Sequence, residues 1–482
     1  MKNRKTTTII LTVGIGTFMS ALDTSIVNLA LPLIKNNFGV SLSMVVWIVT
    51  AYLLVVSSLL LTFGRLSDLY GHKKVYLTGF VIFTFGSLLC ALSPNITTLI
   101  AFRIVQAIGA GMLFSTGPAI ITNAVPPENR GKALSITAIA VALGLCVGPV
   151  LGGTLSTLFG WQSIFYINVP IGIFGLIMVI NNIPAEKAAE SVPFDFAGSL
   201  LIFFALLLIL LPLDISGDYP IPPALFIGLI TAGLLLIVWF VIHEKRFKYP
   251  MLNMSFFKNR VFAASNAAAI FIYMSQFIMI FLTPFYLVTL RGYTAMQSGL
   301  LYLPMPLATM FVAPISGSAS DRVDSRYISS IGALILACGL YMLSFLKADT
   351  PNVYIIVSMI VSGAGFGMFQ TPNNSAIMGS VPLKNRGTAS GTLATMRNIG
   401  MVLGVAVSGA LFSHAESNAV QLLSLQGQSE PLLSSNAFIY ALHLTALVAA
   451  AVAVAAMVAS FVKGKVPTEM DKENVNTSQN KY

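Results

Sequence analysis

Residues 9–31 have the sequence IILTVGIGTFMSALDTSIVNLAL, an apolar run that contains one carboxylate, Asp23. Three basic residues, Lys2, Arg4 and Lys5, precede this run. It is longer than the apolar part of a secretory signal peptide and lacks a small-residue cleavage site. A stretch of about 20 apolar residues is enough to cross a bilayer as a helix. The run therefore predicts a first membrane helix.

The composition extends this prediction to the whole chain. Of the 482 residues, 56% are hydrophobic and only 9% are charged, whereas a soluble domain has about a quarter charged residues. The chain is therefore expected to be an integral membrane protein. Its net charge of +10 does not indicate nucleic-acid binding, because the basic residues flank apolar runs and form no single patch. The three cysteines have no paired spacing, so neither a disulfide nor a metal site is expected, and no cofactor.

Apolar runs recur along the chain and predict an all-α protein of fourteen membrane spans, with both termini on one side. If the N-terminus is inside, 22 of the 27 Lys and Arg residues lie in cytoplasmic segments and three in outer loops. This bias is the positive-inside pattern, so we expect a multi-pass protein of the cytoplasmic membrane with both termini in the cytoplasm. The approximate spans are 9–31, 45–64, 75–93, 97–121, 134–157, 164–183, 195–213, 224–242, 262–288, 298–319, 327–346, 353–378, 388–412 and 437–462.

An internal repeat divides these spans into two sets. Residues 129–131 (Asn-Arg-Gly) recur as residues 385–387, and Gly144 and Gly148 align with glycines at the same offset. Two six-helix bundles around an inserted hairpin explain the repeat, and transporters place the substrate cavity between such halves. The expected units are an N-terminal bundle (1–190), an inserted transmembrane hairpin (191–245), a C-terminal bundle (246–466) and a disordered cytoplasmic tail (467–482).

Four motifs follow one another along the chain. They are LDTSIVNLALP (22–32), GRLSDLYGHKK (64–74), RIVQ (103–106) and GLCVGPVLGG (144–153), the last followed by WQSIFYINVPIG (161–172). Over nearly the whole chain, this order resembles the 14-helix drug:proton antiporter branch of the major facilitator superfamily. The resemblance implies the major facilitator fold and export of drugs or quaternary ammonium compounds, but it does not identify a substrate. The match departs at Ala107, where the family motif usually has glycine.

Asp23 and Arg103 are the candidate proton-coupling residues. A carboxylate deep in a span is costly unless it pairs with another group or meets water. At a rise of 1.5 Å per residue, both residues lie about 10 Å or less below the outer ends of their spans, so we expect them to pair. The resemblance also implicates this arginine in proton coupling. A permanently ionised pair with a structural role is the alternative.

Polar residues inside the spans are candidates for the substrate cavity. Arg397 is a second buried cation, which either faces the cavity or donates to backbone carbonyls. The predicted cavity residues are Gln106, Asn266, Gln276, Gln370, Asn373 and Arg397.

The loop between spans 2 and 3 is the candidate cytoplasmic gate. Its glycines permit a tight turn, and Asp68 can interact with the positive end of a helix dipole. The resemblance places that helix at span 13, so the loop would latch the two halves together. The alternative is that its positive charge only sets the topology. The predicted gate residues are Gly64, Arg65, Asp68, Gly71, Lys73 and Lys74.

Span 5 is expected to be the antiport helix. Glycines at four-residue spacing leave one face of this helix open to a close neighbour, and a proline bends it. The resemblance associates this motif with antiport, whereas simple small-residue packing is the alternative. Its residues are Gly144, Gly148, Pro149, Gly152 and Gly153.

The sequence thus predicts a proton-coupled antiporter that exports amphipathic small molecules by alternating access. Its partners are a small-molecule substrate, protons and the lipid bilayer; a membrane-fusion adaptor would join only in a host with an outer membrane. The alternative on the same fold is a dedicated metabolite or lipid exporter, or a proton symporter for uptake. An enzyme is not expected, because the sequence has no nucleophile–base set, metal cluster or nucleotide motif, and the two-half motifs disfavour a channel.

Overall fold

The structure, a computed structural model, describes residues 2–125, 130–184, 195–215, 221–247, 250, 252, 254–320, 323–382, 386–425 and 430–464. At some helix positions in these ranges, including Arg65, Asp68 and residues 130–139, only the backbone is described. Every regular element in the described ranges is a helix. The predicted tail, 467–482, lies outside them.

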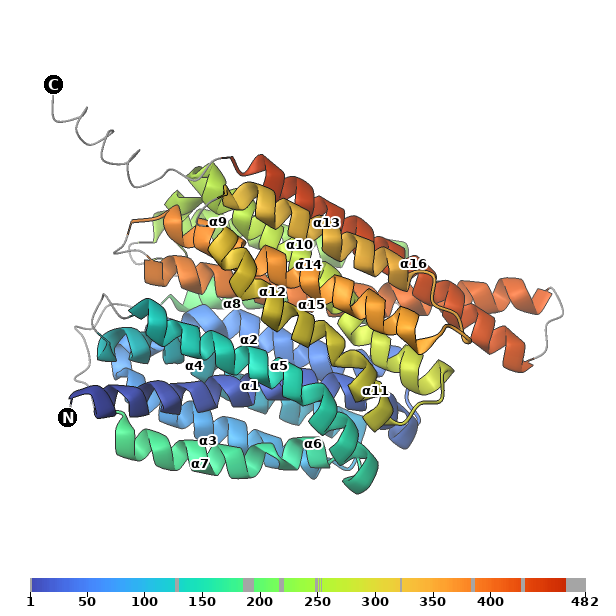
Figure 1. The fold of residues 1–482 in the computed structure, drawn as a ribbon, viewed down its shortest axis with the longest axis horizontal. Coiled ribbons are helices and arrows are strands. Elements are labelled where there is room, and N and C mark those ends of the chain that lie inside the picture. Colours follow the sequence, from blue (N-terminus) through green and yellow to red (C-terminus); the bar gives the residue numbers. More distant parts are fainter. Residues whose placement is uncertain are drawn as a thin grey trace.

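The helices follow one another with short connections (Figure 1). The first set is α1 (Lys2–Phe38), α2 (Leu42–Tyr70), α3 (His72–Ala91), α4 (Ile96–Ala124), α5 (Arg130–Phe159), α6 (Ser163–Tyr166) and α7 (Asn168–Asn182). A helical hairpin of α8 (Phe196–Ile215) and α9 (Pro223–Arg246) comes next. The remaining elements are η2 (Met254–Lys258), α10 (Arg260–Phe285), η3 (Tyr286–Leu290), α11 (Ala295–Tyr302), α12 (Pro304–Ser320), α13 (Ser325–Leu343), α14 (Asn352–Gly379), α15 (Arg386–Leu425) and α16 (Glu430–Val462).

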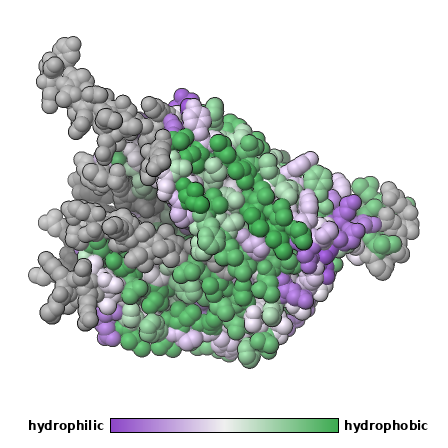
Figure 2. Space-filling view, in the orientation of Figure 1, coloured by the Kyte–Doolittle hydropathy of each residue, from purple (hydrophilic) through white to green (hydrophobic). Residues whose placement is uncertain are grey.

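The expected all-α membrane architecture is confirmed. Twelve helices of the described chain are long and apolar enough to cross a membrane, and two shorter apolar helices, Val147–Phe159 and Phe196–Pro212, lie where spans 5 and 7 are predicted. Figure 2 shows apolar side chains across the middle of the visible face and hydrophilic ones toward its right-hand end. An apolar middle with a polar end is what a bilayer-spanning protein requires.

Helices α15 and α16 are longer than the sequence predicts. The expected spans are 388–412 and 437–462, but the helices run to Leu425 and begin at Glu430, so they extend past the other helices in Figure 1. Residues 413–425 are too polar for a hydropathy-based span, yet they contain neither glycine nor proline. Helix propensity therefore carries the helix beyond its apolar part.

The internal repeat is visible in the packing. Helix α1 packs on α5 as α10 packs on α15, and α3 packs on α4 as α13 packs on α14. Likewise α2 packs on α4 as α12 packs on α14. These equivalences are what two homologous bundles would give, and α8 lies against α2 of the first and α15 of the second. The domain boundaries themselves remain a prediction.

Close contacts join the two halves toward the end of the molecule where α2 begins. Gly409 on α15 packs against Val46 on α2, and the hydroxyls of Ser43 and Ser413 are 3.4 Å apart. Gly153 on α5 likewise packs on the backbone of Ala295, at the start of α11. The absence of a side chain at these glycines lets helices of opposite halves approach closely.

Candidate functional site

Asp23 is the centre of a buried polar network in the first half. Its side chain is fully buried on α1. Oδ2 accepts a hydrogen bond from Arg103 Nη1 at 2.7 Å, and Oδ1 accepts from Gln106 Nε2 at 2.8 Å and from Asn168 Nδ2 at 2.9 Å. All three donors are N–H groups, which is the arrangement that an ionised carboxylate can accept at both oxygens. The predicted pairing of Asp23 with Arg103 is confirmed.

Arg103, on α4, is 1% exposed, and several neighbouring groups contact its guanidinium. Its Nε donates to the carbonyl of Ile48 on α2 at 3.2 Å, and Nη1 also donates to Gln106 Oε1 at 2.6 Å. The guanidinium lies over the Tyr52 ring, 4.0 Å from the ring centroid. A buried cation over an aromatic face gains a cation–π contribution in addition to its ion pair.

Gln106 belongs to this network and is fully buried. It was expected to line the substrate cavity, but its Nε2 bridges Asp23 and the hydroxyl of Ser87 on α3, 2.7 Å away. The three-residue spacing from Arg103 had already placed both side chains on one helix face. In this structure that face points into the first bundle and its carboxylate.

Asn168 and Ser87 complete the site, and sequence reasoning did not single them out. Asn168 lies at the start of α7 and is fully buried, within the motif at 161–172. An amide flanked by Ile167 and Val169 within a predicted span was the available signal for Asn168. Ser87 had no such signal, because serine is common in membrane helices and only the packing of α3 on α4 brings it to Gln106.

The glycine face of α5 packs on α1 directly beside Asp23. A Cβ at Gly144 would lie 2.8 Å from the backbone nitrogen of Leu22, and a Cβ at Gly148 would collide with the hydroxyl of Ser25. Ser25 Oγ donates to the carbonyl of Gly144 at 3.2 Å. Gly152 continues the same contact against Ile26. The four-residue glycine spacing thus fixes the position of the helix turn that carries Asp23.

Arg397 in the second half faces an aromatic ring. Its guanidinium lies 4.8 Å from the ring centroid of Tyr273 on α10, and the hydroxyl of Tyr273 accepts from Gln370 Nε2 on α14 at 2.9 Å. Arg397 and Gln370 are partly exposed, whereas Tyr273 is buried. The structure therefore brings two predicted cavity residues together through a tyrosine that the sequence prediction omitted.

The other predicted cavity residues are buried, and the amide oxygen of each one accepts no hydrogen bond from the described residues. Asn266 donates to the carbonyl of Phe262, Asn373 donates to the carbonyl of Ser265 at 3.0 Å, and Gln276 donates to the sulfur of Met305 at 3.3 Å. Their side-chain oxygens have no hydrogen-bond partner among the described residues. Such oxygens are acceptors that a ligand or water could satisfy.

The predicted gate is only partly described. Gly71 has a φ of +93° between α2 and α3, a conformation that favours glycine, so the expected tight turn is present. Lys73 donates to the carbonyl of Ile180 on α7, at 2.9 Å, within its own half. Gly64 is partly buried and Lys74 is exposed. The side chains of Arg65 and Asp68 lie outside the described residues, so contact with the second half stays a prediction.

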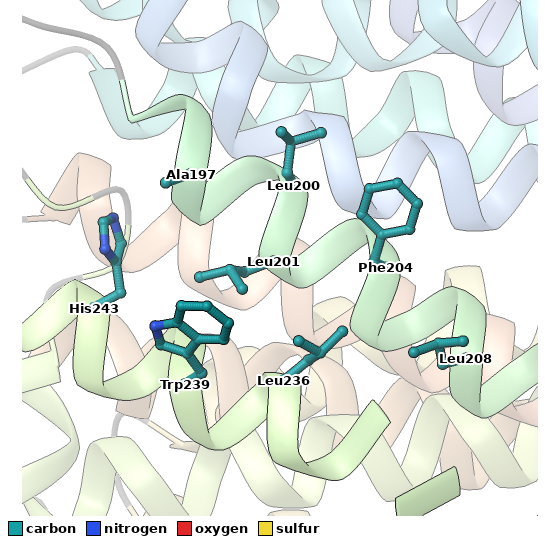
Figure 3. A pocket seen from close by; sticks show the side chains of 8 residues that line it. All are labelled: Ala197, Leu200, Leu201, Phe204, Leu208, Leu236, Trp239 and His243. Carbon is teal, nitrogen blue, oxygen red and sulfur yellow. The ribbon is translucent and has the colours of Figure 1, made fainter. Parts of the chain in front are cut away.

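An apolar groove lies between α8 and α9, apart from this network. Figure 3 shows Leu200, Leu201 and Phe204 of α8 opposite Leu236 and Trp239 of α9. His243 stands at one end of the groove. The lining is almost entirely apolar, so the groove does not resemble a site that selects a polar substrate.

Known proteins place this arrangement in a family. The pattern of the Major Facilitator Superfamily matches residues 13–405, which includes the whole Asp23 network. The chain belongs to this superfamily. It is a multi-pass membrane transporter of the superfamily that acts on small molecules, in agreement with the resemblance seen in its motifs.

Relatives within the superfamily differ in the substrates in their names. The chain is 39% identical over 408 residues to riboflavin transporter RibZ of Clostridioides difficile (strain 630), covering 84% of this chain and 88% of RibZ. It is 31% identical over 418 residues to multidrug transporter protein MdtP of Bacillus subtilis (strain 168), covering 86% and 77%. It is also 31% identical over 415 residues to multidrug resistance protein Stp of Mycobacterium tuberculosis (strain CDC 1551 / Oshkosh), covering 85% and 76%.

Solved transporters have the same fold at low identity. A bacterial homolog of the human lysosomal transporter Spinster, in an inward-facing and unoccupied conformation, matches with a TM-score of 0.71 and 15% identity over 95% of this chain and 97% of that one. A D-xylose–proton symporter matches with a TM-score of 0.62 and 16% identity over 92% and 96%. These likenesses concern the fold alone.

Proposed function

We propose that this protein is a proton-coupled antiporter that exports amphipathic small molecules across the cytoplasmic membrane by alternating access. The observation that carries the proposal is the fully buried Asp23, hydrogen-bonded to Arg103, Gln106 and Asn168 on two other helices. A titratable carboxylate at this depth is a proton-relay candidate by default. The multidrug relatives support export of amphipathic compounds.

The network suggests how a proton and a conformational change are linked. Protonation of Asp23 removes the charge that Arg103 faces, so the contact between α1 and α4 weakens. Arg103 keeps the Ile48 carbonyl, Gln106 and the Tyr52 ring, and it therefore stays in place while α1 is released. Because α1 packs on the glycine face of α5, movement at Asp23 is passed to the helix whose Gly153 contacts the second half. Substrate would occupy the space lined by Arg397 and Gln370.

The orientation belongs to the same proposal. Both termini lie in the cytoplasm, as the distribution of basic residues favours. The contacts of Gly409 with Val46 and of Gly153 with Ala295 then close the extracellular end, which supports an inward-facing state. The loop at 64–74 would close the opposite end in the outward-facing state.

A second candidate is transport of a dedicated metabolite with a planar ring system. It is favoured by the 39% identity to a protein named as a riboflavin transporter. The cluster of Arg397, Tyr273 and Gln370 supports it too, because an aromatic face with adjacent hydrogen-bond donors suits a flat polar ligand.

Proteoliposomes that contain a luminal pH dye separate the candidates. Addition of ethidium outside should raise the luminal pH if the substrate enters in exchange for protons, whereas symport would lower the luminal pH. Riboflavin, added in parallel, should give the larger response if the protein is a dedicated flavin transporter. Uptake of either compound with no change in luminal pH would contradict proton coupling.

A further inference from the structure

The base of the hairpin α8–α9 holds two carboxylates that the central network does not use. Asp195 directly precedes α8, and Glu244 lies in the last turn of α9. Each residue is only 2% exposed. Acidic side chains are almost never this buried unless their oxygens are satisfied.

One oxygen of each carboxylate is satisfied. Asp195 Oδ1 accepts from the backbone nitrogen of Gly198 at 2.8 Å and lies 2.8 Å from His243 Nε2. Glu244 Oε2 accepts from the backbone nitrogen of Leu252 at 2.8 Å. The remaining oxygens, Asp195 Oδ2 and Glu244 Oε1, have no hydrogen-bond partner among the described residues.

The two unsatisfied oxygens point at the same place. A Cβ built on Gly198 would lie 2.5 Å from Asp195 Oδ2 and 2.9 Å from Glu244 Oε1, so both oxygens lie within 2.9 Å of the same point. Two ionised carboxylates can only accept hydrogen bonds, so they would repel and leave both oxygens unpaired. One added proton turns this contact into a donor–acceptor pair, and both buried oxygens are then satisfied.

We propose that Asp195 and Glu244 form a second proton-binding site, in which Glu244 Oε1 carries a proton and donates it to Asp195 Oδ2. Asp195 is the acceptor in this pair, because its other oxygen already accepts from the backbone nitrogen of Gly198 and lies beside His243 Nε2. Glu244 is the protonated member, and its Oε2 accepts from Leu252 as a carbonyl oxygen does. This site goes beyond the exchange proposed for Asp23 and stands independently of it.

The charged groups around the pair come from several elements. Asp195 lies next to Glu244, and His243 lies 2.8 Å from Asp195 Oδ1. Lys245 and Arg246 share the last turn of α9, and Lys258 ends η2, an element that packs on α9. Helix α15, which packs on α8, carries Arg397, but that guanidinium lies over Tyr273. On α2, the side chains of Arg65 and Asp68 lie outside the described residues.

The proposed proton would stabilise the base of the α8–α9 hairpin, which contacts both halves of the protein. Ser199, one turn into α8, makes a 2.7 Å hydroxyl contact with Thr62 on α2, and its hydroxyl donates to the carbonyl of Asp195. Leu252 lies in the connection that leads to α10. Loss of the proton would leave two buried like charges at this junction and loosen the hairpin from both halves. His243, which also ends the apolar groove in Figure 3, would follow Asp195.

Infrared spectroscopy of the full-length protein in lipid nanodiscs tests the site. At neutral pH the wild type should show a protonated-carboxyl C=O band that E244Q lacks. The amide of E244Q can still donate to Asp195, so this variant should fold with a melting temperature close to that of the wild type. D195N is the second variant: its amide can donate to an ionised Glu244, so the band should disappear there as well.

Two controls assign the band. E416Q alters another carboxyl, on α15, and D23N alters the central one; both should keep the component that E244Q loses. A band that is unchanged in both E244Q and D195N, or a band lost in a control instead, would overturn the second site. If D23N keeps the band but transports normally, only the proposed role of Asp23 fails.

Discussion

Arg103 Nη1 lies 2.7 Å from Asp23 Oδ2, although the two residues are 80 positions apart and neither side chain reaches solvent. The ion pair thus connects α1 to α4 inside the first half of the transporter. Removing one partner of a buried pair leaves an uncompensated charge, which is strongly destabilising, while neutralising both partners is much less so. This asymmetry allows the structural and functional roles of the pair to be separated.

Substitution of Arg103 should distinguish charge from geometry. R103K keeps the positive charge but cannot contact Ile48, Gln106 and Asp23 together as the planar guanidinium does, so transport should fall at least about tenfold. R103A should lose about 3–5 kcal/mol of stability, measured by thermal unfolding in detergent. The double variant D23N/R103Q should recover stability but not gradient-driven transport. Wild-type transport by R103K would contradict the geometric requirement.

Replacement of Asn168 should impair the same network. N168L removes the 2.9 Å hydrogen bond to Asp23 Oδ1 and leaves that oxygen with Gln106 as its remaining donor; a hydrogen bond to a charged group contributes about 1.5–3 kcal/mol. We expect lower stability and slower transport. The matched control is N182L at the end of the same helix, where the amide contacts Thr12 and not the carboxylate. Equal losses of transport in N168L and N182L would mean that replacing any polar residue of α7 with an apolar one impairs transport, and that the contact with Asp23 is not required.

The pair of Arg397 and Tyr273 should control substrate affinity. R397A is expected to raise the KM for riboflavin about tenfold, which corresponds to about 1.4 kcal/mol, and to leave the KM for ethidium unchanged or lower. Y273F keeps the ring below the guanidinium and should have a smaller effect than Y273A. R326A is the control, because Arg326 stacks on Tyr327 in the same way, 4.5 Å from the ring centroid, outside this cluster. A similar change of KM in R326A would remove Arg397 from the cavity.

Lys463 should make stability depend on pH. It follows α16 and is fully buried, and its Nζ donates to the carbonyl oxygen of Ser325 at 3.4 Å. Burial lowers the pKa of Lys463 from 10.5 to about 8. Between these values the unfolded chain binds this proton and the folded protein does not, so stability should rise with pH across that interval.

The K463M variant tests this expectation. It should melt a few degrees higher than the wild type at pH 7, because it removes the cost of burying the charged form, and the difference should shrink above about pH 8. Melting temperatures across this pH range give the comparison. A difference that does not change with pH would mean that Lys463 acts through packing alone.

Depth along a helix was enough to predict the central ion pair, because Asp23 and Arg103 are the charges at matching levels of two antiparallel spans. The direction in which a helix face points was harder to predict. Gln106 shares the face of Arg103, but whether that face points to the cavity or into the bundle depends on how α4 packs on α2 and α3. Asn168 and Ser87 reach the site only through that packing.

The ends of the helices show the other limit of the sequence. Hydropathy predicted each of the twelve membrane-length helices of the described chain, but it ended span 13 at residue 412, whereas α15 continues to Leu425. Membrane insertion depends on apolar residues, whereas continuation of a helix depends on the helix propensity of each residue. The two criteria therefore give different helix ends where polar residues that tolerate a helix follow an apolar span. The buried residues Asp195 and Glu244 lie at the base of the α8–α9 hairpin, which no sequence motif marks.

Gradient-driven transport by D23N is the most direct test of the proposed coupling. Wild-type protein and D23N, each monodisperse and assayed below its own melting temperature, are reconstituted into vesicles. Both are given the same imposed pH gradient, and accumulation of a fluorescent substrate is followed. The wild type should concentrate the substrate against its gradient, whereas D23N should only equilibrate it. Accumulation by D23N at the wild-type rate would contradict the assignment of Asp23 as the proton-coupling group.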